Sequence, residues 1–213
     1  NKVSEINEAA ARISRKAAGD SVWVIASVGP TGEMLITGDV SEEELFDGFR
    51  EQAVALERGG ADAVCIETMS AVDEACLAIQ AVKECTRLEV ICTFTFEQTV
   101  RGDFRTMMGI APAEAARAAV AAGADIVGAN CGNGMERMVT VVKEMRSVLP
   151  GIPILVHANA GLPILVDGVT VFPEKPHDTA SFIPAVLDAG ANIVGGCCGT
   201  TPSHIAAIKR AVE

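Results

Sequence analysis

Short apolar runs alternate with amphipathic segments along the chain. The apolar runs are continuous, which is typical of parallel strands buried on both faces, and they predict six strands over residues 22–27, 61–67, 89–95, 125–129, 153–158 and 191–196. Apolar residues at helical spacing predict helices over residues 3–18, 41–57, 70–84, 112–122, 135–148, 179–189 and 202–212. The alternation of strand and helix predicts an α/β fold built on a parallel sheet.

Two polar or irregular stretches, 97–109 and 164–176, are predicted to be loops. A short motif also recurs before three of the predicted strands, where a glycine and an alanine precede Asp or Asn and an apolar run, at residues 60–64, 123–127 and 190–194. The simplest interpretation is a repeated connection in which the glycine ends a helix. The motif therefore marks where these strands begin, and hence where they end.

Polar residues gather at the predicted carboxyl ends of the strands: Ser27, Glu67, Thr68, Thr95, Asn130, Cys131, Asn159, Cys197 and Cys198. In a β/α barrel this end carries the active site, because the connecting loops converge there. A complete barrel has eight units in roughly 250 residues, whereas this chain of 213 residues gives six.

Composition narrows the class of protein. With 49% hydrophobic residues, residues 1–213 are expected to form a single domain. The formal net charge of −11 argues against nucleic acid or an anionic membrane as a partner, and no segment predicts a membrane-spanning helix or a signal peptide. The seven cysteines are an odd number, and four of them lie within predicted strands or helices, so we expect free thiols and a cytoplasmic location.

Two adjacent cysteines, Cys197 and Cys198, follow the last predicted strand and precede a helix start in which Thr201 can cap and Pro202 can take the first position. A helix N-terminus lowers the pKa of nearby thiols, so we expect a reactive or metal-bound pair. Cys131 follows another strand, and three thiolates with an open fourth position are typical of a catalytic zinc site. Buried thiols or a redox pair remain alternatives.

The motif Gly-Gly-Cys-Cys-Gly-Thr-Thr-Pro at 195–202, together with 128–132, 159–161 and 67–69, resembles the homocysteine S-methyltransferase family. The resemblance implies a zinc-dependent transfer of a methyl group to homocysteine, giving methionine. It implies Cys131, Cys197 and Cys198 as the zinc ligands that make the site catalytic, and Glu67 and Asn159 as substrate-binding residues. We also assign Thr68 and Ser27, at the same strand ends, to substrate binding.

The resemblance further implies a TIM-type (β/α)8 barrel, of which this chain lacks the first two strands and keeps six βα units. The expected partners are therefore a missing barrel segment, a corrinoid protein or a second copy of the chain. The implied methyl donor is methylcobalamin or another methyl carrier.

Two other functions remain open. Gly195 and Gly196 before a helix start resemble the phosphate cradle of barrel isomerases and aldolases, although no Lys lies at a predicted strand end. The chain can also be a non-catalytic, metal-binding partner in a corrinoid methyltransferase system. We expect His157 to be a core or loop histidine and not a fourth ligand.

Overall fold

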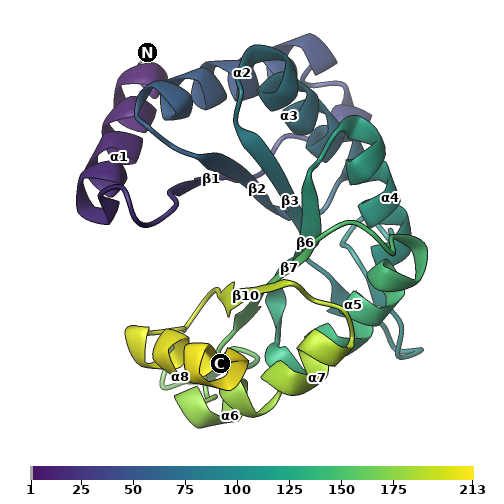
Figure 1. Cartoon of the computed structure of the whole chain (residues 1–213). Helices are drawn as coiled ribbons and strands as arrows, with labels where there is room; N and C mark the ends of the chain where they lie inside the picture. The colour runs from purple at the N-terminus through teal and green to yellow at the C-terminus, as the bar shows by residue number, and fades with distance from the viewer. Residues whose placement is uncertain (1) are drawn as a thin grey trace. The chain divides into compact units, whose positions relative to one another are not determined.

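The computed structural model describes residues 2–213 (Figure 1). Its main sheet has six strands in the order β1–β2–β3–β6–β7–β10, and the pairs β1/β2, β6/β7 and β7/β10 are parallel. These strands are β1 (Ile25–Val28), β2 (Ala63–Met69), β3 (Glu89–Phe94), β6 (Ile126–Gly134), β7 (Ile154–Asn159) and β10 (Ile193–Gly196). The prediction of a parallel sheet is confirmed, with strand boundaries shifted by a few residues.

Helices fill the connections as the periodicity predicts. They are α1 (Val3–Ala18), α2 (Glu42–Arg58), α3 (Val72–Cys85), α4 (Pro112–Ala122), α5 (Met135–Val148) and α8 (Pro202–Val212), with a short 3-10 turn, η1 (Leu35–Thr37). The helix predicted over 179–189 is instead two helices, α6 (Pro176–Ser181) and α7 (Ile183–Asp188). Pro184 lies in the first turn of α7, and because proline has no backbone N–H it cannot continue a preceding helix.

Both predicted loops contain short antiparallel hairpins, so those two predictions are wrong in part. β4 (Glu97–Gln98) pairs with β5 (Phe104–Arg105), and β8 (Ile164–Val166) pairs with β9 (Val169–Val171). Asp167 and Gly168 both have positive φ, 49° and 80°, which is the two-residue hairpin turn that an Asp-Gly pair favours. Among residues 2–213, no helix combines the length and hydrophobicity that a membrane crossing requires.

The chain forms two compact units, which we describe separately. The first contains the residues up to Cys92 together with Ala118–Asp125, and the second contains Thr93–Arg117 together with Ile126–Glu213. In the first unit α1 packs on α2 and α2 on α3, and small side chains of α3 such as Ala75 and Ala78 are fully buried. In the second unit α5 packs on β6 and β7, and α6 on α8.

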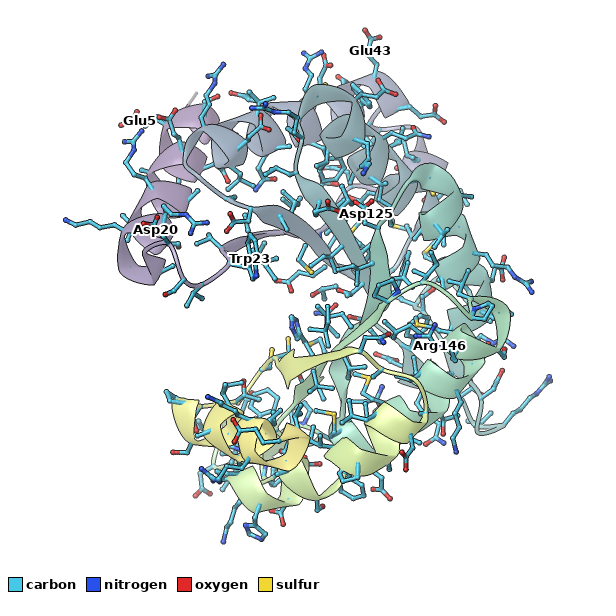
Figure 2. The ribbon with its side chains drawn as sticks, in the orientation of Figure 1. Glu5, Asp20, Trp23, Glu43, Asp125 and Arg146 are labelled. Atoms are coloured by element: carbon cyan, nitrogen blue, oxygen red, sulfur yellow. The ribbon has the colours of Figure 1, made fainter. Side chains whose placement is uncertain are left out.

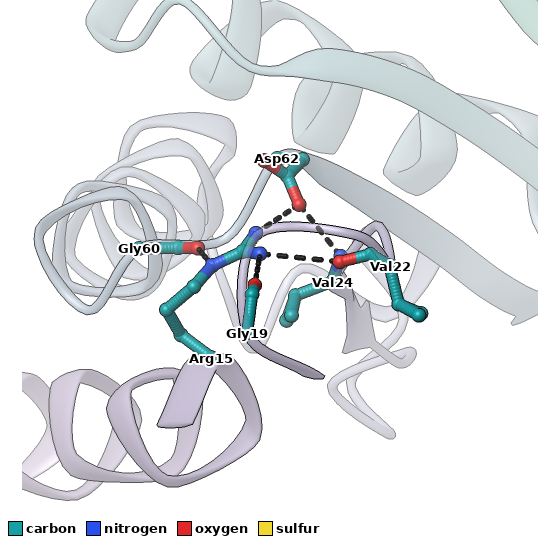
Figure 3. A network of polar contacts seen from close by, with 6 residues as sticks. All are labelled: Arg15, Gly19, Val22, Val24, Gly60 and Asp62. Atoms are coloured by element: carbon teal, nitrogen blue, oxygen red, sulfur yellow. Dashed lines mark hydrogen bonds and ion pairs between the residues drawn. The ribbon is translucent and has the colours of Figure 1, made fainter. Parts of the chain in front are cut away.

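The recurring Gly-Ala-Asp/Asn motif forms a hydrogen-bonded clamp in each of its three copies. In the first copy Asp62 accepts a hydrogen bond from the Val24 N–H at 2.6 Å and forms an ion pair with Arg15 of α1 (Figure 3). Arg15 also donates to the carbonyl oxygens of Gly19, Val22 and Gly60. The clamp therefore ties the end of α1 to the starts of β1 and β2.

The other two copies repeat this arrangement. Asp125 accepts from the Val90 N–H at 2.8 Å and pairs with Lys83 at 3.0 Å. Asn192 accepts hydrogen bonds from the Ile154 N–H at 3.0 Å and from Arg146 at 2.8 Å. Asp125 and Arg146, one residue from each of these two clamps, are labelled in Figure 2. The repeat thus aligns neighbouring strands at their amino ends, which leaves their carboxyl ends for polar residues.

Candidate metal centre

Three cysteine sulfurs lie together in the second unit. The Sγ atoms of Cys131, Cys197 and Cys198 are all within 4.8 Å of one another. The Sγ atom of Cys198 is 3.8 Å from that of Cys131 and 4.0 Å from that of Cys197. Cys131 and Cys197 are half-buried and Cys198 is exposed, so the cluster is open to solvent on one side.

Cys131 lies within β6, and not just past a strand end as predicted. The register between β6 and β7 shifts between Asn130 and Gly134, and Cys131 there has a φ of 60°. A bulge of this kind redirects a side chain, and a non-glycine residue at positive φ costs free energy that the surrounding structure must offset. The apolar run in the sequence predicts a strand that ends at Ala129, because the residues in the bulge are polar or glycine.

The Cys197–Cys198 loop is fixed by backbone hydrogen bonds to β7 and to Ala160, the residue that follows β7. The Cys197 N–H donates to Ala158 O at 2.7 Å, and the Ala160 N–H donates to Cys198 O at 2.9 Å. Thr200 closes the turn, since its Oγ1 donates to Cys197 O at 2.7 Å. Both cysteines therefore have a backbone position set by β7.

Asn159, at the end of β7, is buried and takes part in this positioning. Its Oδ1 accepts a hydrogen bond from the Cys198 N–H at 3.1 Å. We predicted a substrate contact for Asn159, and that prediction remains untested. The structure gives the residue a second task, which is to orient the backbone of Cys198.

Asn130 provides a side-chain donor to the cluster. It is fully buried, and its Nδ2 lies 3.8 Å from Cys197 Sγ. Thr93 Oγ1 donates to Asn130 Oδ1 at 2.7 Å, which turns the amide nitrogen toward the sulfur. A donor to a thiolate stabilises the charged form, so Asn130 favours Cys197 as a ligand.

The expectation of lowered thiol pKa values is wrong for the metal-free cluster. Burial, together with the neighbouring Cys131, raises the pKa of Cys197 to about 12, and the Asn130 donor offsets only part of this. Burial and Cys131 likewise raise the pKa of Cys198. Loss of water and the neighbouring thiols outweigh the hydrogen bonds that stabilise the charged forms.

The sulfur geometry fits a tetrahedral metal ion. Zn–S bonds of about 2.3 Å in a tetrahedron place neighbouring sulfurs about 3.8 Å apart. The Sγ–Sγ distances of 3.8 Å from Cys198 to Cys131 and 4.0 Å from Cys198 to Cys197 are close to that spacing. Among the described residues, these three cysteines form the group of Cys, His, Asp or Glu side chains able to hold an ion, and His157 is not part of it.

His157 instead packs against β10, as its pairing with Gly195 requires. A Cβ on Gly195 would lie 2.7 Å from the His157 ring, and one on Gly196 would lie 2.4 Å from the Thr200 side chain. These two glycines therefore make room for neighbouring side chains, which accounts for them without a phosphate.

In the first unit, the structure brings two of the predicted substrate-binding residues together. Ser27 Oγ donates to Glu67 Oε1 at 2.5 Å, which joins β1 to β2. Thr68 follows Glu67 with a φ of 63°, a strained conformation for a β-branched residue. Strain of this kind is common at functional sites, and the roles of these three residues in substrate binding remain predictions.

Three residues of this centre were not among the predicted site residues: Asn130 and Thr93, described above, and His204 in the first turn of α8. Asn130 precedes Cys131 in the predicted motif, so its position was visible in the sequence. The sequence does not reveal that Asn130 contacts Cys197, which is 67 residues away.

The chain belongs to the homocysteine S-methyltransferase family, whose model matches residues 1–212. A methionine synthase from Mycobacterium leprae is 30% identical over the whole chain, and one from Mycobacterium tuberculosis is 27% identical. The chain spans only 18% of the length of each of these relatives.

Solved structures support the fold. The apo form of the homocysteine methyltransferase MmuM from Escherichia coli superimposes with a TM-score of 0.76 at 23% identity, covering 98% of this chain and 74% of that one. Its metallated form gives a TM-score of 0.70 over 94% of this chain and 65% of that one. The fold is therefore the α/β fold of these methyltransferases, a TIM-type barrel fold of which this chain supplies six βα units.

Proposed function

We propose that this chain binds zinc through Cys131, Cys197 and Cys198 and transfers a methyl group to the thiol of homocysteine, giving methionine. The observation that carries the proposal is the spacing of the three sulfurs, which matches a tetrahedral zinc site with one open position. The family match supports homocysteine as the thiol.

When bound, zinc supplies a Lewis acid whose open position accepts a thiol and lowers its pKa, so that the thiolate forms near neutral pH. The protein holds the three ligands in place through the β6 bulge and the bonds from the Cys197–Cys198 loop to β7. Asn130 donates toward Cys197 and stabilises negative charge on that sulfur.

The reaction then needs only the thiolate and an activated methyl group. A sulfur lone pair forms the new S–CH₃ bond, while the bond between the methyl carbon and the donor breaks and its electron pair leaves with the donor. The thiol proton is released when the thiolate forms. Methylcobalamin or another methyl carrier is the proposed donor.

Glu67 is proposed to bind the substrate amino group, because it is a half-buried carboxylate at a strand end and already accepts from Ser27. Thr68 and Asn159 are proposed to complete the substrate contacts. A cytoplasmic location is part of the proposal, since the structure leaves all seven cysteines as free thiols.

Metal content and turnover test the proposal. We expect one zinc ion per chain, lost in Cys197→Ser and kept in Cys85→Ser, a half-buried cysteine outside the cluster. Homocysteine with a panel of methyl donors should yield methionine only in chains that hold zinc. Zinc binding without any effect of homocysteine would favour a non-catalytic partner, and absence of zinc would refute the proposal.

A further inference from the structure

We propose that His204 is a positioning residue that holds the Cys197–Cys198 loop in its metal-binding geometry. It does so by tying the start of α8 to the segment before α6. This inference rests on the proposed zinc site, but it concerns a residue that is not one of the three proposed ligands.

The contacts of His204 define its tautomer. The ring is buried, with Nε2 3.0 Å from Glu174 O and Nδ1 2.9 Å from Thr201 Oγ1 and 3.2 Å from Thr201 N. A carbonyl oxygen can only accept, so Nε2 carries the proton. The Thr201 N–H can only donate, so Nδ1 is an acceptor, and both ring nitrogens are hydrogen-bonded.

These bonds close a circuit around the cysteine loop. His204 donates to Glu174 O, the Glu174 N–H donates to Ala160 O at 3.0 Å, and the Ala160 N–H donates to Cys198 O at 2.9 Å. His204 returns to the loop through Thr201, three residues after Cys198. A break at His204 therefore frees one side of the turn that carries two of the three sulfurs.

The segment before α6 is a firm anchor for this circuit. A Cβ on Gly199, within the cysteine loop, would lie 2.3 Å from the Phe172 side chain, so Phe172 packs directly on that turn. The Glu174 side chain packs over Gly134 and Gly161, at the ends of β6 and just past β7. The segment is thus held by three neighbours, and His204 connects it to α8.

Helix capping alone does not account for the whole arrangement. A capping box needs only an acceptor at the third helical position that reaches the Thr201 N–H, and Nδ1 supplies it. The Nε2 bond reaches a carbonyl 30 residues earlier and contributes nothing to the cap. The two functions of the ring can therefore be separated by substitution.

The test compares His204→Ala, His204→Gln and His204→Asn in the 213-residue chain, with His177→Ala as the matched control. Gln retains a donor near the Nε2 position, whereas Asn retains only a group near Nδ1. His177 is an exposed histidine in α6, whose side chain is 78% exposed. Co²⁺ titration reports metal affinity through thiolate charge-transfer absorption, and amide hydrogen exchange of the metal-free chain reports the circuit.

We expect His204→Ala and His204→Asn to weaken Co²⁺ binding about tenfold or more and to speed exchange of the Ala160 and Glu174 amides. His204→Gln should stay closer to the unsubstituted chain in both measurements, and His177→Ala should match it. If His204→Ala does not fold, the Co²⁺ affinity and amide exchange of His204→Gln and His204→Asn are compared with each other and test the inference.

Wild-type affinity and amide exchange in a folded His204→Ala chain would overturn the inference, as would full rescue by Asn but not by Gln. Either result would leave the zinc proposal intact. If the unsubstituted chain binds no Co²⁺ or Zn²⁺, the proposed function fails first and the inference with it.

Discussion

The amide nitrogen of Asn130 lies 3.8 Å from the sulfur of Cys197, and the hydroxyl of Thr93 fixes its orientation. Asn130→Asp keeps the shape of the side chain but places a negative charge beside a thiolate. We expect zinc affinity to fall about 10- to 100-fold, measured by competition with a chelator.

Thr93→Val is the companion variant, since it removes only the bond that orients the amide. Its loss of zinc affinity should be smaller than that of Asn130→Asp. Equal zinc affinity in Asn130→Asp and the unsubstituted chain would mean that this donor does not act on the site.

Zinc binding should release protons. The pKa of Cys197 is raised to about 12 and that of Cys198 is also raised, so both thiols are protonated at pH 7 without metal. Coordination requires thiolates, and we therefore expect about two or more protons per zinc ion, measured with a pH indicator in weak buffer. Zinc affinity should fall as the pH falls. Release of less than one proton per zinc ion would show that Cys197 and Cys198 are not both protonated in the metal-free chain.

Gly196 leaves space for Thr200, which in turn bonds Cys197 O. Gly196→Ala would place a Cβ 2.4 Å from the Thr200 side chain, and we expect a loss of about 1–3 kcal/mol in the free energy of unfolding, measured with urea. Gly151→Ala is the control, since a Cβ there meets nothing within 4 Å. Equal losses in both variants would refute a local packing role.

The clamp at Asp62 predicts an acid dependence of stability. The Val24 N–H is the main cause that lowers the pKa of Asp62. Burial opposes it, and the hydrogen bond and charge of Arg15 each add a smaller lowering. The stabilisation is therefore complete above the unfolded-state pKa of about 3.9 and is lost as the pH falls through the lower folded-state pKa.

Asp62→Asn should be less stable than the unsubstituted chain at pH 7, and this difference should shrink in urea unfolding below pH ~4. The exposed Asp20→Asn is the matched control and should show neither effect. A pH-independent difference would show that the charge of Asp62 is not what stabilises the clamp.

The sequence allowed much of this molecule to be predicted because most of its elements follow local rules. Helices α1 and α5 match the expected ranges, since their apolar residues recur at helical spacing. The break at Phe182 was missed because helical periodicity continues across Pro184. The hairpin at Asp167 and Gly168 is absent from the prediction because its strands are short and exposed, although the Asp-Gly pair itself favours the turn.

The sequence predicts which residues lie near the carboxyl ends of the strands, and the candidate site could be predicted only to that extent. Cys131, Cys197 and Cys198 were brought together correctly, because parallel strands place their carboxyl ends side by side. The direction of the thiol pKa shifts was predicted wrongly, since it depends on burial and on groups distant in sequence. The role of His204 as a connection to Glu174 likewise depends on a contact that no periodicity reveals.

X-ray absorption at the zinc edge counts the sulfur ligands of the bound ion and therefore tests the proposed three-cysteine zinc site itself. We expect three sulfurs at about 2.3 Å in the zinc-loaded chain, and four after homocysteine is added. The Cys197→Ser chain should not hold the ion. An unchanged sulfur count on addition of homocysteine, or a zinc site without three cysteine sulfurs, would contradict the proposed zinc site with its open position for the substrate thiol.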